Sequence, residues 1–399
     1  MHRRSFLRTT AVSAGVVLAP ALLSRSFAAA ASGTAASCVV PRVGAPYGPL
    51  QPPDTNGLRL PRGFTSRIVA ISGIAVAGTT YAWHPAPDGG ACFTVPDRSG
   101  DYVYVSNAET LGPIGGGVSA IRFRADGRIR SAYRILSGTN INCAGGATPW
   151  GTWLSGEELP TGQIWECDPF RASQGIARPA MGVYRHEAAA VDPVHRKVYL
   201  TEDAGDGRLY RFTPRTYPDL SVGRLEVARI VGASVRWVEV SNGPIGATQP
   251  RPPDTTAFNG GEGIWYHAGF VYFTTKGDNR VWKLDTRTQT ICVFYDDDLV
   301  NGAPLHNVDN VFVSTAGEVI VAEDPDDLQL VVLREGTFAG TVVGPLVQVV
   351  GQTDTELAGP AFSPRGDRLY FSSQRARGRA NLGAGITYEV TGPFMGRAT

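Results

Sequence analysis

The chain has 399 residues, including 48 glycines and 28 prolines, and only 18% of its residues are charged. Coiled coils and helical bundles need long runs of helix-forming residues with few glycines, so these classes are excluded. The hydrophobic fraction of 43% is enough for a large core, and 37 basic and 36 acidic side chains leave a formal net charge of +1. No overall field draws such a chain to nucleic acid or to an anionic membrane, so any charge-based function must be local.

Residues 1–31 have the pattern of a secretory signal peptide, because Arg3, Arg4 and Arg8 precede an apolar run and a stretch of small residues. The apolar run is short and contains proline, and no other stretch reaches the ~18 residues of a membrane helix, so we expect no stable membrane insertion. The arginine pair before SFL resembles a twin-arginine signal. We predict export by the twin-arginine machinery to the periplasm or the medium. An ordinary secretory signal is the alternative, and a lipid anchor at Cys38 is less favoured.

The composition after the signal divides the chain into two parts. Residues 32–56 are rich in proline, alanine and glycine and predict a linker, and residues 57–399 predict a single domain. The five cysteines are scattered and form no C-x-x-C pair of the kind that binds structural zinc. In an exported protein an odd number of cysteines leaves at least one thiol free or otherwise engaged.

One unit recurs along the predicted domain. It has a short apolar strand, a turn, a second strand that ends in polar or acidic residues, and a third strand with aromatics, as in HEAAAVDPVHRKVYLTED followed by GRLYRFTP. Four copies are clear and two earlier copies are more diverged. This pattern is typical of a β-propeller, so we predict an all-β, six-bladed β-propeller, with a two-sheet sandwich as the alternative. The strand-like segment 63–73 is expected to pair with the last blade and close the ring.

Polar residues fall at two recurrent positions of the unit, the start of the first strand and the end of the second. The start of one antiparallel strand faces the end of the next, so both positions are expected at one end of the propeller axis. Two carboxylates about 4 Å apart repel by roughly 4 kcal/mol at an effective dielectric near 20. Either several of the acids are protonated or cations lie among them, and multivalent cations with oxygen ligands are the commoner solution. The predicted metal ligands are Cys143, Glu157, Glu158, Glu187, Glu202, Asp203, Glu262, Asn310, Glu323, Asp324 and Glu356.

Cys143 is the one sulfur atom in this set. A buried cysteine is usually a small apolar residue, but beside a ring of carboxylates it is a candidate thiolate ligand. A mixed thiolate and carboxylate shell suits iron, and calcium can occupy the all-oxygen positions. For each single acid, a solvated turn or a strand-end cap is the alternative interpretation.

Several segments, in this order, resemble the PhoX family of exported alkaline phosphatases, also called the DUF839 domain; examples are NCAGGATPWGTWLSGEE, HEAAAVDPVHRKVYLTEDAGDGRLYRFTP and DNVFVSTAGEVIVAED. The resemblance spans residues 102–371. It implies a six-bladed propeller with a cluster of iron and calcium ions at one end of its axis, held by a cysteine that matches Cys143 and by carboxylates of the set above. It also implies hydrolysis of small phosphomonoesters by metal-activated water. The chain departs from the family pattern at SGEE, VSNAE and SSQRA.

Three basic side chains fall at the same rim and are candidates for holding a phosphate dianion: Arg375, Lys276 and His186. Arg375 is favoured for its bidentate geometry, and ion pairs with nearby acids are the alternative role. The sequence has no G-x-S-x-G elbow and no P-loop, so serine-hydrolase and nucleotide-powered chemistry have no support. We therefore predict a monomeric, exported phosphatase of the PhoX type. A non-catalytic calcium-binding propeller that binds a ligand or partner is the first alternative, and a metal-dependent propeller hydrolase of lactones or phytate is the second.

Overall fold

The computed structural model describes residues 37–396 except 98, 112–114, 173–174, 242–248, 337–339 and 376–384. These residues belong to one compact unit, 34–399, and the predicted signal peptide lies outside them. The described chain is all-β apart from single-turn helices, and none of its helices has the length and apolar character of a membrane span. The single-turn helices are η1 (Pro179–Met181), η2 (Lys276–Asp278) and η3 (Asp297–Leu299).

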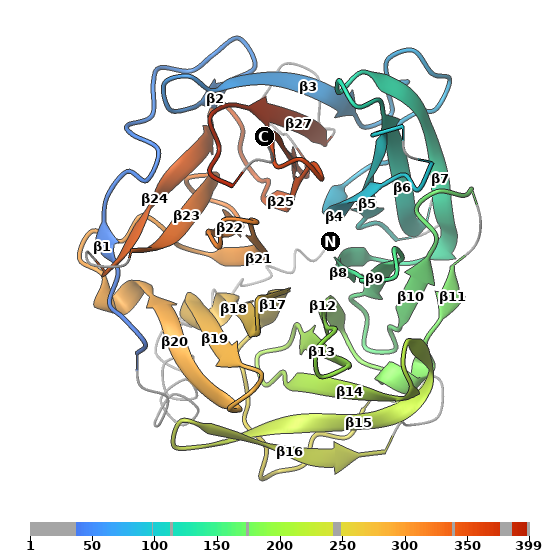
Figure 1. Ribbon diagram of the computed structural model, residues 1–399, viewed down its shortest axis with the longest axis vertical. Coiled ribbons are helices and arrows are strands. Elements are labelled where there is room, and N and C mark those ends of the chain that lie inside the picture. Colours follow the sequence, from blue (N-terminus) through green and yellow to red (C-terminus); the bar gives the residue numbers. More distant parts are fainter. Residues whose placement is uncertain are drawn as a thin grey trace, which may run out of the picture. The chain divides into compact units, whose positions relative to one another are not determined.

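The strands have a β-propeller-like arrangement, with sheets that radiate from a central axis (Figure 1). The first strand of each repeat lies innermost, and each inner strand contacts the next until the last contacts the first. The inner strands are β4 (Pro87–Thr94), β8 (Asn142–Ala147), β12 (His186–Asp192), β17 (Gly261–His267), β21 (Val308–Val313) and β25 (Leu357–Phe362).

Three further strands follow outward from each inner strand, each antiparallel to its neighbour. The second strands are β5 (Tyr102–Ala108), β9 (Trp153–Glu157), β13 (Lys197–Glu202), β18 (Phe270–Thr275), β22 (Val319–Glu323) and β26 (Arg368–Ser373). The third strands are β6 (Gly116–Phe123), β10 (Ile164–Cys167), β14 (Leu209–Thr216), β19 (Arg280–Asp285), β23 (Gln329–Gly336) and β27 (Ile386–Thr391). The outer strands are β7 (Ile129–Thr139), β11 (Ile176–Ala177), β15 (Asp219–Val231), β20 (Thr290–Asp296), β24 (Gly340–Val349) and β3 (Thr65–Ile71).

The hydrogen-bonded sheets number five in the described part of the chain, not the six that the repeats predicted. The third and fourth repeats share one nine-stranded sheet. The link is β16 (Ser234–Val240), which forms a long hairpin with β15 and meets the edge of β20 at the pair Ser234–Thr290. An exposed strand edge favours pairing with another strand, and here β16 supplies that partner from the same chain.

The ring is closed by a strand from the beginning of the chain. As predicted for residues 63–73, β3 pairs with β27, and Ile71 lies opposite Ile386. The last sheet therefore takes its outer strand from the N-terminal part of the chain, which leaves no open edge at that position.

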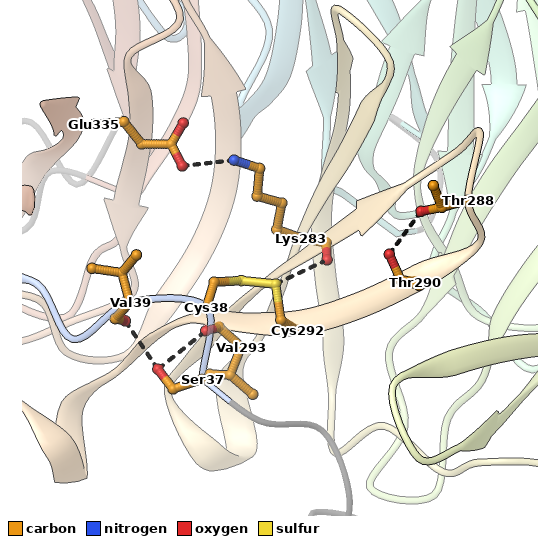
Figure 2. The surroundings of a disulfide bond; sticks show 9 residues. All are labelled: Ser37, Cys38, Val39, Lys283, Thr288, Thr290, Cys292, Val293 and Glu335. Atoms are coloured by element: carbon orange, nitrogen blue, oxygen red, sulfur yellow. Dashed lines mark hydrogen bonds and ion pairs between the residues drawn. A yellow bond between two sulfur atoms is a disulfide. The ribbon is translucent and has the colours of Figure 1, made fainter. Parts of the chain in front are cut away.

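Residues 37–64, which we call the N-terminal strap, are held against the propeller. Their first part was predicted as a linker, but Cys38 forms a disulfide with Cys292 on β20 (Figure 2). The Cys38 N–H also donates to Val293 O at 2.9 Å. The strap then adds two short strands to β24, the parallel β1 (Arg42–Val43) and the antiparallel β2 (Leu58–Arg59). The three other cysteines are free thiols, as their odd number led us to expect.

Small residues allow the inner strands to lie close to the axis. A Cβ atom on Gly263 would lie 2.3 Å from the backbone nitrogen of Val311 on the next inner strand, and one on Gly89 would lie 2.5 Å from Ala144 Cα. Neither backbone can retreat at such distances because both belong to paired strands. The starts of the inner strands consequently converge at one place.

Candidate metal centre

A β-bulge interrupts every inner strand that the structure describes. In β12 the register with β13 shifts between His186 and Ala189, so that Glu187 lies inside the bulge. A bulge leaves its residues out of the regular ladder and redirects a side chain. In five inner strands the first residue of the bulge is an acid or a cysteine, and in β25 it is Gly359. The five are Asp88, Cys143, Glu187, Glu262 and Asp309.

A second set of polar side chains comes directly after the second strands. These residues are Glu109, Glu158, Asp203, Lys276, Asp324 and Gln374. The two sets meet: Gln374 Nε2 donates to Asp88 Oδ2 at 2.5 Å and to Glu109 Oε2 at 2.8 Å. The starts of the inner strands and the ends of the second strands thus lie at the same end of the axis, as expected for antiparallel neighbours.

We call the acids and the cysteine of these two sets, together with Glu356 just before β25, the axial cluster. The potential ligand atoms of Cys143, Glu158 and Glu187 all lie within 4.8 Å of one another, and two further trios within the cluster meet the same limit. The further trios are Asp88, Glu109 and Glu356, and Glu187, Glu262 and Asp309. The full cluster is Asp88, Glu109, Cys143, Glu158, Glu187, Asp203, Glu262, Asp309, Asp324 and Glu356.

The deepest members of the cluster are held out of water. Burial raises the pKa of Asp88 and Glu187 well above the ordinary value, and neighbouring carboxylates raise it further. The pKa of the Cys143 thiol is also raised by burial, and then by Asp88 and Glu187. Cations placed among these groups would favour their ionised forms, since opposite charge at short range lowers the pKa of an acid.

Two other members have pKa values close to neutrality. Burial, and then the charge of Asp203, raises the pKa of Glu158 to about 7. Burial, and then the charge of Asp324, raises the pKa of Asp309 to about 7. These two carboxyls are therefore partly protonated near pH 7 whenever no cation accompanies them.

The donors of the axial cluster fit a mixed metal centre. Cys143 Sγ lies 3.2 Å from Glu187 Oε1 and 3.7 Å from Asp88 Oδ2. Glu187 Oε2 is buried and has no hydrogen-bond partner among the described residues, so it is free to bind a cation. A soft sulfur beside hard oxygens suits iron, and the all-oxygen trios suit calcium.

Three of the predicted ligands do not belong to the cluster. Glu157, Glu202 and Glu323 end their strands and lie within their own sheets, where each accepts a backbone hydrogen bond from the residue six positions later. The donors are Gln163, Arg208 and Gln329, at 3.3, 3.0 and 3.0 Å. Successive side chains along a strand point in opposite directions. In each of the pairs 157–158, 202–203 and 323–324, the first acid therefore points into its own sheet and the second points toward the axis.

Two more predicted site residues have structural roles. Asn310 donates to Asp309 Oδ1 at 2.8 Å and accepts from the Gly359 N–H at 2.8 Å, so it orients an acid of the cluster instead of offering a free oxygen. His186 is fully buried, its Nε2 lies 3.1 Å from Gly182 O, and its ring stacks on Tyr184. Burial lowers the pKa of His186 to about 3, so the neutral ring is not available to a phosphate dianion.

The two other predicted phosphate ligands do reach the cluster. Arg375 Nη2 lies 2.7 Å from Glu109 Oε2, and Nη1 lies 3.9 Å from Glu356 Oε1. Lys276 Nζ lies 2.6 Å from Glu262 Oε1 and 3.5 Å from Asp203 Oδ2. Burial alone would lower the pKa of Lys276, but these two acids raise it above its ordinary value.

Three cluster members were absent from the predicted set: Asp88, Glu109 and Asp309. Asp309 directly precedes the predicted ligand Asn310 in the sequence, and only the bulge decides which of the two faces the axis. Asp88 could have been found from its pattern, because an acid or cysteine followed by two small residues also occurs in Cys143-Ala-Gly and Glu187-Ala-Ala.

Fold and site together define a β-propeller-like protein with a cluster of carboxylates and one thiol at one end of its axis. The family described as alkaline phosphatase PhoX matches this chain over residues 104–164 and 160–290, so the chain is similar to the PhoX family across that segment. No curated protein matches the sequence.

Two solved structures are similar to this chain in fold. PhoX of Pseudomonas fluorescens, solved in complex with vanadate, a transition state analogue, is 16% identical, has a TM-score of 0.68, and the match covers 90% of this chain and 100% of that one. A Bacteroides thetaiotaomicron protein of unknown function is 12% identical with a TM-score of 0.50, over 86% and 84% of the two chains.

Proposed function

We propose that this protein is an exported, metal-dependent phosphatase that hydrolyses small phosphomonoesters at the axial cluster, with iron and calcium as cofactors. The observation that carries the proposal is the trio of Cys143, Glu158 and Glu187, whose ligand atoms lie within 4.8 Å of one another. The match to the PhoX family over residues 104–290 supports the reaction class. Two all-oxygen trios beside the thiol support a centre of more than one ion.

Cys143, Glu158 and Glu187 would hold iron, and Asp88, Glu109, Glu356, Glu262 and Asp309 would hold calcium. The bound metals would supply charge for the phosphate oxygens and a nucleophilic water at neutral pH. Arg375 is about 40% exposed beside Glu109, and we assign it to hold the substrate's phosphate through its planar guanidinium. The described chain places no serine or histidine nucleophile in the cluster, and the proposed reaction needs none.

The proposal is tested by metal analysis and by turnover of p-nitrophenyl phosphate before and after chelation. We expect iron and calcium in the purified protein, and loss of turnover after chelation that returns when both metals are restored. The Cys143→Ala variant is expected to lose iron and turnover while its near-UV circular dichroism stays that of the wild type. Turnover that survives complete metal removal would overturn the mechanism.

A non-catalytic calcium-binding propeller is the competing function, and the same experiment separates the two. A protein that binds calcium, contains no iron after reconstitution and turns over no phosphomonoester would belong to that class. The matched control is Cys167→Ala, because Cys167 is a free thiol buried between sheets and outside the cluster. This control variant is expected to keep its iron.

Three further features belong to the proposal. Export is supported by the Cys38–Cys292 disulfide, since such bonds persist mainly outside the cytoplasm. Six blades are supported by the six inner strands, if the nine-stranded sheet is counted as two blades that β16 connects. We also propose that the protein acts as a monomer, which light scattering at working concentration tests.

A further inference from the structure

Lys276 occupies a position that is acidic in four other repeats. It follows β18 directly, and the acids that follow the other second strands in the same way are Glu109, Glu158, Asp203 and Asp324. The equivalent positions point toward the axis, so the lysine introduces a positive charge into a ring that is otherwise mainly negative.

The ammonium group of Lys276 is placed between two acids of the axial cluster. Its Nζ lies 2.6 Å from Glu262 Oε1 and 3.5 Å from Asp203 Oδ2. These acids come from different repeats, since Glu262 lies in the bulge of β17 and Asp203 follows β13. The ammonium thus bridges two repeats, as a metal ion bound to the same oxygens would.

The backbone around Lys276 is fixed. The Lys276 N–H donates to Gly260 O at 2.8 Å, and the Gly277 N–H donates to Asn259 O at 3.0 Å. A Cβ atom on Gly277 would lie 2.3 Å from Asn259 Cγ, so the two loops are in close contact. The side chain can move, but its point of attachment stays beside Asp203 and Glu262.

We propose that the Lys276 ammonium takes the place of one metal ion in the axial cluster, so that no metal binds between Asp203 and Glu262, while Glu262 still belongs to the trio with Glu187 and Asp309. A divalent cation between Asp203 and Glu262 would meet the ammonium at short range, and like charges at such distances repel strongly. The inference rests on the proposed metal centre and limits the number of ions that this centre holds. It assigns Lys276 to charge compensation, not to the substrate.

The test is a count of calcium per chain in variants of Lys276. Lys276→Glu restores the acid found at equivalent positions, and we expect about one additional calcium per chain by mass spectrometry after equilibration with calcium. Lys276→Gln removes the charge and offers one oxygen, so it is expected to gain the same ion with lower affinity. Lys276→Arg keeps the charge and is expected to keep the wild-type count. Lys283→Gln is the matched control, because Lys283 pairs with Glu335 outside the cluster (Figure 2).

A second measurement covers the case in which the glutamate variant fails to fold. Calcium should raise the midpoint of thermal unfolding of Lys276→Gln by more than it raises that of the wild type, because an additional ion binds only the folded state. An unchanged calcium count in Lys276→Gln at saturating calcium would overturn the inference. A raised KM for p-nitrophenyl phosphate with unchanged metal content would assign Lys276 to the substrate instead. The metal count needs no activity, so failure of the proposed reaction is distinguishable from failure of this inference.

Discussion

Two adjacent carboxylates at the end of one strand have opposite surroundings in this protein. Glu202 lies within its sheet, where the Arg208 N–H and the Tyr210 hydroxyl donate to it at 3.0 and 3.1 Å and Arg251 forms an ion pair with it. Asp203, the next residue, faces the axis, where its only described ion pair is with Lys276. One acid of the pair therefore stabilises its own sheet, and its neighbour belongs to the axial cluster. Pairs 157–158 and 323–324 repeat the arrangement.

A substitution at the centre of the axial cluster should reduce activity more than any other change. Glu187→Gln is expected to lower turnover of p-nitrophenyl phosphate by more than about 100-fold and to reduce the bound metal, since Glu187 is shared by two of the ligand trios. The metal-free variant should be no less stable than the metal-free wild type, because it lacks a buried acid that neighbouring acids repel. Full activity in this variant would contradict the assignment of the axial cluster as the metal centre.

Substitution of an acid that points into its own sheet should instead lower the stability of the fold. Glu202→Gln is expected to lower the free energy of unfolding by about 2 kcal/mol, because it removes the charge that Arg251 and the backbone N–H of Arg208 satisfy. Urea denaturation measures this change. Asp203→Asn is the matched variant, and it should leave the stability of the metal-free protein nearly unchanged. If Glu202→Gln lost as much metal as Glu187→Gln, the distinction between structural acids and metal ligands would be wrong.

The smallest expected effect is on the pH dependence of stability. The pKa values of Glu158 and Asp309 are raised to about 7 in the folded protein by burial and by neighbouring acids. Between pH ~4.5 and ~7 the folded state therefore binds more protons than the unfolded state, so the free energy of unfolding falls as the pH rises. We expect a loss of at least about 1 kcal/mol across this window in chelator. Saturating calcium should flatten the profile, and an identical slope with and without calcium would contradict this.

The repeated strands, the closing strand and the end of the axis where the acids gather could all be predicted from the sequence. The choice between Glu157 and Glu158, or between Asp309 and Asn310, could not, because neighbouring residues face opposite sides and the bulge that sets the register leaves no plain mark in the sequence. The merged sheet was missed because the hairpin of β15 and β16 lies between two copies of the repeat. The Cys38–Cys292 pair spans 254 residues, and five cysteines allow several pairings.

The pairing of β3 with β27 has a consequence for synthesis. β3 leaves the ribosome early, but its partner is among the last strands to be made, so the ring cannot be completed on a nascent chain. A product that terminates early would keep two unsatisfied strand edges and be an easy substrate for proteases. Only a chain that includes β27 can therefore pair β3, so the order of the strands makes closure of the ring depend on nearly complete synthesis.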